Sequence, residues 1–256
     1  MPSLSSSRLR GAIVPAIAIV LWEVFFRVYG VQSDAFAAPS VTLQKGVQAL
    51  LDGALLQATV QTVGAALGGL AIGALCGVSS GIALGLCMPA YRLFNVSIEL
   101  IRPIPSVALI PVAMLVFGFG YRMEMAVVAF STVWPLLILT RSAIGSVEPR
   151  LLEVAHVIGL SPWARIRKII LPAALPRIIV ALRLAIGIAL VVAVTVEIAA
   201  NPLGLGYGML VAQQSLDPGL MLALLLWIGL LGWALNILMD KVQHRLLRGP
   251  GDGGAA

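Results

Sequence analysis

Charged residues are scarce in this sequence: they make up 11% of the 256 residues, whereas soluble domains carry about 25%. Apolar residues contribute 60%, and the mean hydropathy is +1.02. This composition excludes a soluble globular domain and predicts an integral membrane protein with one transmembrane domain. The net charge of +6 raises nucleic acid as a partner. The basic residues lie in short loops between apolar runs, however, which is typical of membrane topology and predicts no nucleic-acid binding.

Cysteine and histidine occur only twice each. Cys76 and Cys87 share one apolar run, and eleven helical residues separate them by about 16 Å, which is too far for a disulfide. His156 and His244 lie far apart in polar segments, so no metal site is predicted. The sequence also lacks a phosphate-binding G-x-x-x-x-G-K-S/T loop and any Ser/His/Asp or paired-carboxylate arrangement. We therefore expect no catalytic residue and no cofactor in this chain.

Long apolar segments dominate the rest of the sequence, and a helix needs about 20 apolar residues to cross a bilayer. Six segments are predicted to span, which makes the expected fold class all-α: 11–29, 54–87, 93–117, 123–140, 178–200 and 219–239. Residues 1–10 are predicted to be a cytoplasmic tail, residues 11–247 the transmembrane domain, and residues 248–256 a Gly-rich disordered tail.

The first span has an alternative interpretation as a cleaved signal peptide, because Ala35-Phe36-Ala37 resembles a cleavage site. Glu23 and Arg27 interrupt the approach to that site, so we interpret residues 11–29 as a retained span. Ser40 is placed to cap a short amphipathic helix within 31–53, which we expect along the outer interface. Residues 201–208 are rich in turn-forming residues and are predicted to form an outer loop.

Glycine recurs every four residues within the uncharged run 54–87, at Gly69, Gly73, Gly77, Gly81 and Gly85. Residues four apart lie on one face of a helix, and small residues allow another membrane helix to approach closely. The pattern therefore predicts a groove for helix packing rather than a ligand site.

The distribution of Lys and Arg predicts the orientation, because cytoplasmic loops of membrane proteins carry an excess of both. With the N-terminus inside, thirteen of them lie on or near the inner side and only Arg27, Lys45 and Arg122 lie outside, while Arg102 is within the membrane. We therefore expect both termini and the polar segment 148–172 in the cytoplasm.

Residues 148–172 form the longest polar interval and are predicted to fold as two short helices joined by a tight turn. Apolar residues in the first half fall at helical spacing. Gly159 can end the first helix in the left-handed conformation, because it has no Cβ. Ser161 can cap the second helix, and Pro162 fits its first turn. Such a well-delimited helix-turn-helix between two spans indicates a docking surface.

Six residues of this segment follow the spacing E-x-A, three residues, G, nine residues, I-x-L-P: Glu153, Ala155, Gly159, Ile169, Leu171 and Pro172. The pattern resembles the cytoplasmic EAA loop in the membrane subunits of ATP-binding-cassette (ABC) importers, with Val154 in place of the family's middle alanine. In that family the loop carries a coupling helix that inserts into a cleft of a separate ATPase. The resemblance implies that these residues couple the chain to such an ATPase. An ordinary amphipathic surface helix-turn-helix is the alternative.

The resemblance extends over residues 40–247 and is closest to the nitrate/sulfonate/taurine branch of importer permeases. It is carried by Ile104-Pro-Ser106, Phe117-Gly-Phe-Gly120, Leu171-Pro-Ala-Ala-Leu-Pro176, Leu182-Arg-Leu184, and Glu197 with Gly204-Leu-Gly206. The implied fold is the type I importer (MetI-like) fold in a bacterial inner membrane. The implied partners are two ATPase subunits that bind ATP and Mg²⁺, a second permease subunit expected to be a copy of this chain, and an extracytoplasmic solute-binding protein. The implied activity is import of a small solute of the sulfonate, taurine or nitrate type.

Ionisable residues within spans are candidates for function, because they are costly in lipid. Glu99 and Arg102 lie three apart on one helix face and can neutralise each other. Pro103 and Pro105, which precede Ser106, remove backbone donors and disturb the helix. We expect these residues to form either a gate or wall of the translocation pathway, or a structural ion pair near the cytoplasmic interface.

Glu197 lies in the fifth predicted span, near its outer end. It is expected either to line the pathway or to pair across a subunit interface. The pathway role is the less favoured of the two, because an acidic group is a poor direct partner for an anion. Two other function classes compete with an importer permease. A self-contained secondary transporter or channel needs no ATPase, and no inverted repeat is evident in its favour. A membrane enzyme is disfavoured by the lack of a catalytic cluster.

Overall fold

The computed structural model describes residues 4–29 and 36–247, and this part of the chain is helical, without a strand. Residues 1–3 of the predicted N-terminal tail, the whole predicted C-terminal tail (residues 248–256) and residues 30–35 of the cleavage-like region lie outside the described residues. Four described helices are long and apolar enough to cross a bilayer: α3 (Ala54–Leu86), α6 (Tyr121–Gly145), the continuous stretch Pro162–Ala199, and α11 (Pro218–Leu247). A bent pair, α4 (Met88–Ile101) with Ser106–Phe117, raises the number to five if it counts as one span. The expected all-α membrane fold is confirmed.

The first helix, α1 (Leu4–Tyr29), contains the first predicted span but begins inside the predicted tail. Its Glu23 accepts hydrogen bonds from the backbone N–H and the hydroxyl of Ser40, at 3.0 and 2.8 Å. Ser40 belongs to α2 (Pro39–Leu51), the predicted amphipathic helix. The predicted capping role of Ser40 is wrong: Ala38 occupies the N-cap, and the Ser40 hydroxyl binds α1 instead.

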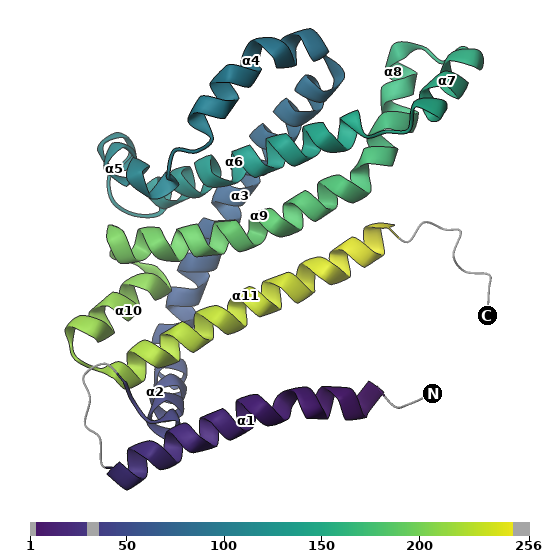
Figure 1. Ribbon diagram of the computed structural model, residues 1–256. Coiled ribbons are helices and arrows are strands. Elements are labelled where there is room, and N and C mark those ends of the chain that lie inside the picture. Colours follow the sequence, from purple (N-terminus) through teal and green to yellow (C-terminus); the bar gives the residue numbers. More distant parts are fainter. Residues whose placement is uncertain (1–3, 30–35, 248–256) are drawn as a thin grey trace.

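The shorter elements are η1 (Ser106–Leu109), α5 (Ile110–Phe117), α7 (Pro149–Val157), α8 (Pro162–Arg165), η2 (Ile166–Ile170), α9 (Leu171–Ala199) and α10 (Gly204–Gln214). In Figure 1, α6, α9 and α11 lie side by side, and α3 crosses behind them. One end of the molecule holds α7 and α8, together with the start of α1 and the end of α11. The opposite end holds α5, α10 and α2. The helices α6 and α9 therefore run from the α7–α8 segment to the far end.

The predicted glycine groove on α3 is confirmed, and α6 occupies it. A Cβ added to Gly77 would lie 2.6 Å from the carbonyl oxygen of Val133 and 2.8 Å from the Cβ of Leu136. The row continues in the same register: Gly69 faces Val128, Gly73 faces Thr132, Gly81 faces Thr140 and Gly85 faces Ile144. Because both rows repeat every four residues, the two backbones remain in close contact along the whole row.

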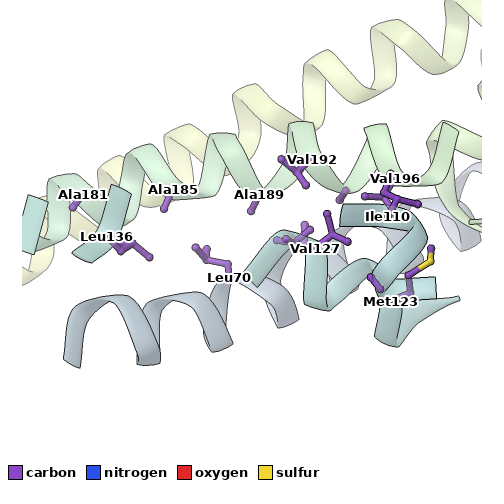
Figure 2. Packing of buried hydrophobic residues seen from close by; sticks show 14 residues of the cluster. Leu70, Ile110, Met123, Val127, Leu136, Ala181, Ala185, Ala189, Val192 and Val196 are labelled. Carbon is purple, nitrogen blue, oxygen red and sulfur yellow. The ribbon is translucent and has the colours of Figure 1, made fainter. Parts of the chain in front are cut away.

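The main apolar core lies where α9 packs against α6, α3 and α5 (Figure 2). Small side chains on α9 face this core at Ala181, Ala185 and Ala189, whereas α3 and α6 contribute larger ones such as Leu70 and Leu136. The pairing of small with large side chains brings the helix axes close while filling the space between them. The three helices α3, α6 and α9 therefore form the rigid centre of the fold.

The third predicted span, residues 93–117, is broken rather than straight. α4 ends at Ile101, and the chain bends by 84° before it continues through η1 and α5. Pro103 and Pro105 explain the break, because neither donates a backbone hydrogen bond and each disfavours helical geometry in the preceding residue. The predicted disturbance of the helix by these prolines is confirmed.

The predicted outer loop, residues 201–208, is wrong in its second half, because α10 already begins at Gly204. Three N–H groups in the first turn of α10 donate to side chains of α3 and α9: Gly204 to Gln61 (3.1 Å), Leu205 to Thr62 (2.9 Å) and Gly206 to Glu197 (2.8 Å). Local sequence favours a turn here, but these tertiary hydrogen bonds satisfy the free N–H groups that a helix start exposes.

An ion pair ties α2 to the turn before α11: Lys45 Nζ lies 2.7 Å from Asp217 Oδ2. Partial burial raises the pKa of Asp217, but hydrogen bonds from Lys45 and from the backbone N–H of Leu220 outweigh it and hold the pKa below its usual value. The side chains of Lys45 and Asp217 are 41% and 28% exposed, so solvent screens the pair. We expect it to contribute about 0.2–1 kcal/mol.

Replacing Asp217 by asparagine is expected to lower the thermal midpoint of the detergent-purified protein by about 1–3 °C at neutral pH. A carboxyl whose pKa is lowered on folding stabilises the fold above its unfolded pKa, and this contribution is lost as the pH falls through the folded pKa. The difference from the wild type should therefore shrink below about pH 4. Asp52→Asn, at an exposed position after α2, serves as the control. If Asp217→Asn lowered the thermal midpoint equally at neutral pH and below about pH 4, the ionised Asp217 would not be the cause of the difference.

Candidate functional site

The turn between α7 and α8 is closed by a Schellman motif centred on Gly159. The N–H of Leu160 donates to the carbonyl of Ala155 and the N–H of Gly159 donates to that of His156, both at 3.0 Å. Gly159 has φ +71°, in the left-handed region that a residue without Cβ adopts readily. The predicted end of the first helix is confirmed.

The second helix starts at the predicted cap, because the Ser161 hydroxyl accepts a hydrogen bond from the N–H of Ala164 at 3.3 Å. It is not short, however: α8 continues through the π-helical turn η2 into α9, so that one helix covers Pro162–Ala199. The wide π turn directly precedes Pro172, whose ring would otherwise meet the carbonyl one turn earlier. The segment α8 and the membrane helix α9 are therefore parts of one continuous helix.

The motif residues divide between the interior and the surface of this segment. Ala155 is fully buried, Ile169 and Leu171 are half-buried, and Pro172 is exposed. Leu171 packs against a cluster from α6 and α9: Ala143, Ile144, Ala174 and Ile178. Glu153 is exposed and makes no ion pair or side-chain hydrogen bond to any described residue. The apolar motif residues thus shape the segment, whereas the carboxylate is available to a partner.

Three large apolar side chains are exposed around the same turn: Val157 by 85%, Ile158 by 63% and Trp163 by 71%. We call these three residues the α7–α8 apolar surface. Apolar groups exposed together outside the predicted spans make this turn a candidate interaction surface. Motif reasoning missed them because the motif does not include them. The signal that was available is a tryptophan within a polar interval.

The bend between α4 and η1 carries the residues predicted for the pathway. Of these, Arg102, Pro103 and Pro105 are exposed and Ser106 is half-buried. The predicted Glu99–Arg102 ion pair is absent from the described structure. Glu99 instead accepts a hydrogen bond from the side-chain amide of Asn95, one turn earlier, at 2.8 Å. The charge of Arg102 is therefore presented at the surface of this chain, at predicted membrane depth.

Glu197 is 1% exposed, although both of its expected roles require a carboxyl that reaches the surface. Its Oε2 accepts the N–H of Gly206, and a Cβ at Gly204 would collide with its carboxyl group. Glu124 on α6 faces the same carboxyl, and Asn201 donates to Glu124 Oε2 at 2.6 Å. Sequence reasoning missed Glu124 and Asn201, because only the tertiary packing brings these residues to Glu197.

Comparison with known proteins places the chain among transport proteins. A family profile described as "Binding-protein-dependent transport system inner membrane component" matches residues 69–249. The chain is 27% identical over 240 residues to the putative aliphatic sulfonates transport permease protein SsuC of Bacillus subtilis, covering 94% of this chain and 87% of that protein. It is 30% identical over 200 residues to the bicarbonate transport system permease protein CmpB of Synechococcus elongatus, covering 77% and 72%. Over 179 residues it is 25% identical to the nitrate import permease protein NrtB of Leptolyngbya laminosa, covering 70% and 64%.

A solved structure confirms the expected fold. One chain of the inward-facing MetNI methionine ABC transporter matches with a TM-score of 0.68 at 18% identity, over 76% of this chain and 97% of that one. The fold is thus MetI-like, and the chain is a non-catalytic membrane component of a transport complex. The family match includes the α7–α8 segment and the bend at Arg102. The chain therefore belongs to the inner membrane components of binding-protein-dependent transport systems, the permease subunits of ABC importers.

Proposed function

We propose that this permease subunit imports a small oxyanion, and that a separate ATPase drives it by docking on the α7–α8 segment. The α7–α8 apolar surface carries the proposal, because Val157, Ile158 and Trp163 are exposed on a segment that lies between two membrane helices. Glu153 is exposed on the same segment and has no partner among the described residues. An apolar surface beside a free carboxylate fits a protein cleft better than it fits lipid or water.

The remaining parts of the proposed complex follow from the family. Two ATPase subunits bind ATP and Mg²⁺, since this sequence has no phosphate-binding loop. Two copies of this chain form the pathway, and an extracytoplasmic binding protein delivers the solute. The start of α1, the end of α11 and the α7–α8 segment lie at one end of the molecule (Figure 1). We assign that end to the cytoplasm, because the predicted inner side carries most Lys and Arg.

The substrate class rests on the relatives and on Arg102. The printed names of three relatives refer to sulfonates, bicarbonate and nitrate, which are small anions with charge spread over several oxygens. Arg102 is exposed at the bend, without a carboxylate partner in the described chain. A guanidinium fork binds two oxygens of one anion at once. We therefore assign Arg102 to the translocation pathway as an anion contact.

Replacing Arg102 by glutamine is expected to reduce uptake of the anion by about 10- to 100-fold, because a hydrogen bond to a charged group is worth about 1.5–3 kcal/mol. Arg102→Lys should keep part of the activity, since it retains the charge but not the fork. Arg92→Gln is the matched control, because Arg92 is exposed on α4, the helix that ends just before Arg102. Uptake by proteoliposomes containing the whole complex measures the effect. Equal uptake by Arg102→Gln and Arg92→Gln would remove Arg102 from the pathway.

The decisive experiment is reconstitution of the chain with its ATPase and binding protein in proteoliposomes. We expect a stoichiometric nucleotide-binding partner to copurify. In vesicles with the ATPase facing inward, ATP enclosed in the vesicles should drive uptake of nitrate, bicarbonate or an alkanesulfonate. A self-contained secondary transporter would instead move solute without the ATPase, driven by an ion gradient. Uptake by the isolated chain under such a gradient, or a lack of any nucleotide-binding partner, would overturn the proposal.

A further inference from the structure

A pair of carboxyl groups is buried at the end of the molecule opposite the α7–α8 segment. Glu124 near the start of α6 is 2% exposed, and Glu197 near the end of α9 is 1% exposed. The two carboxyl groups lie within hydrogen-bonding reach of each other. Two adjacent carboxylates in a dry site repel each other strongly when both are ionised. The pair therefore needs a positive charge or a proton.

A count of hydrogen-bond donors shows where that proton fits. Glu197 Oε2 accepts the N–H of Gly206 at 2.8 Å, and Glu124 Oε2 accepts the amide of Asn201 at 2.6 Å. The other oxygen of each carboxyl, Oε1, is buried and has no donor. A buried acceptor without a donor is costly, and native structures rarely leave one. A hydrogen carried by one carboxyl and donated to the other removes this cost for both.

The surroundings supply no competing charge. No Lys, Arg or His among the described residues forms an ion pair with Glu124 or Glu197. The first turn of α10 contributes only backbone N–H groups, and α3 contributes Gln61 and Thr62. The Thr62 hydroxyl also lies within hydrogen-bonding reach of Glu197, but it has one hydrogen, which it donates to the carbonyl of its own helix at Ala58, 3.1 Å away. Among the described residues, the titratable groups that take part in the hydrogen bonds of this cluster are thus the two carboxyls.

We propose that Glu124 and Glu197 bind one proton between them: Glu124 carries it and donates it to Glu197, which remains ionised. Glu197 is the better anion, because its carboxylate caps the first turn of α10, where the helix dipole and free N–H groups favour negative charge. Glu124 has only the neutral amide of Asn201 as a further partner. The bound proton is a fixed part of the folded structure.

The shared proton lets Glu124 of α6 and Glu197 of α9 remain in contact. It joins α6 to α9 at one end of the molecule, and these two helices flank the α7–α8 segment at the other end. Through the cap on Gly206, the same contact includes α10. Loss of the proton would put two negative charges in contact and weaken the packing of α6 against α9 and α10 at this end of the molecule. We call this arrangement the proton latch, and its existence does not depend on the transported solute or on ATPase docking.

Infrared spectroscopy of the purified full-length protein tests the latch directly. We expect the carbonyl absorption of a protonated carboxyl at neutral pH, shifted by exchange into heavy water. Glu124→Gln, whose amide N–H replaces the donated proton, should lose this absorption. Asp217→Asn removes an ionised carboxylate elsewhere and should leave it unchanged. If the wild-type protein lacks this absorption, the latch does not exist. This result does not depend on whether the variants fold.

Thermal denaturation between about pH 7 and about pH 9 supplies the second measurement. If a proton is bound only in the folded state, each rise of one pH unit lowers the ratio of folded to unfolded protein by up to about tenfold. Stability therefore falls as the pH rises. The wild type should lose thermal stability over this range, whereas Glu124→Gln should not. Parallel pH profiles of the two proteins would overturn the proposal. So would a missing carboxyl absorption combined with stabilisation by Na⁺ or Ca²⁺, which would assign the site to a metal cation.

Discussion

Adding one methyl group at Gly77 is expected to destabilise the membrane domain by about 1–3 kcal/mol, although alanine in a helix is normally better than glycine. The new Cβ would lie 2.6 Å from the carbonyl oxygen of Val133 and 2.8 Å from the Cβ of Leu136. Both atoms are fixed by α6, so α3 and α6 must separate, and the other contacts of the glycine row weaken with them. Gly77→Leu should prevent accumulation of the protein in the membrane. Thermal midpoints in detergent and the amount of protein in purified membranes measure the two effects.

Matched substitutions separate backbone contact from side-chain contact. Gly229→Ala on α11 is the control, because no atom lies within 4 Å of its added Cβ. At Gly73 the added Cβ would meet the Thr132 hydroxyl first, so Thr132→Ala should partly restore Gly73→Ala. Leu136→Ala should not restore Gly77→Ala, because the carbonyl of Val133 remains in place. If Gly77→Ala proved as stable as Gly229→Ala, close packing of α3 on α6 would be ruled out.

The glycine row shows what sequence reasoning captures in a membrane fold and what it misses. Small residues at a spacing of four predict a groove on α3, because close backbone approach is the driving force for helix packing in lipid. The facing row on α6, which includes Val128 and Thr132, gave no comparable signal. Lipid and protein core are both apolar, so hydrophobic periodicity does not distinguish the two faces of a spanning helix. The groove could be predicted, but its occupant could not.

The same division holds at the candidate sites. Gly159 and Ser161 act on neighbouring residues, so the turn that they delimit could be predicted from local capping chemistry. The start of α10 depends on Gln61 and Thr62, which are about 140 residues away in sequence, and no local pattern reveals them. The burial of Glu197 against Glu124 is likewise a tertiary fact. Its expected place in the pathway rested on its position in a span, whereas its environment depends on three other elements.

Replacing Gly159 by valine is expected to uncouple ATP hydrolysis from transport while leaving membrane insertion intact. Gly159 has φ +71°, and a β-branched residue in this region costs on the order of 1–3 kcal/mol. The strain opposes the hydrogen bonds that close the turn, so α7 loses its fixed position and the α7–α8 apolar surface disperses. No atom lies within 4 Å of a Cβ at this position, so the effect comes from backbone geometry rather than from a collision inside the chain. The ratio of solute taken up to ATP hydrolysed in proteoliposomes should fall about tenfold or more.

Three further variants make this result specific to the turn. Gly145→Val lies at the end of α6, also without neighbours around its added Cβ but without a positive φ, and should transport normally. Gly159→Asn should be intermediate, because asparagine tolerates the left-handed conformation better than valine does. Glu153→Lys should reduce coupling by reversing the charge beside the apolar surface, with the turn intact. If Gly159→Val and Glu153→Lys both transported as efficiently as Gly145→Val, the ATPase would have to engage another surface, because neither the shape nor the charge of this segment would then matter.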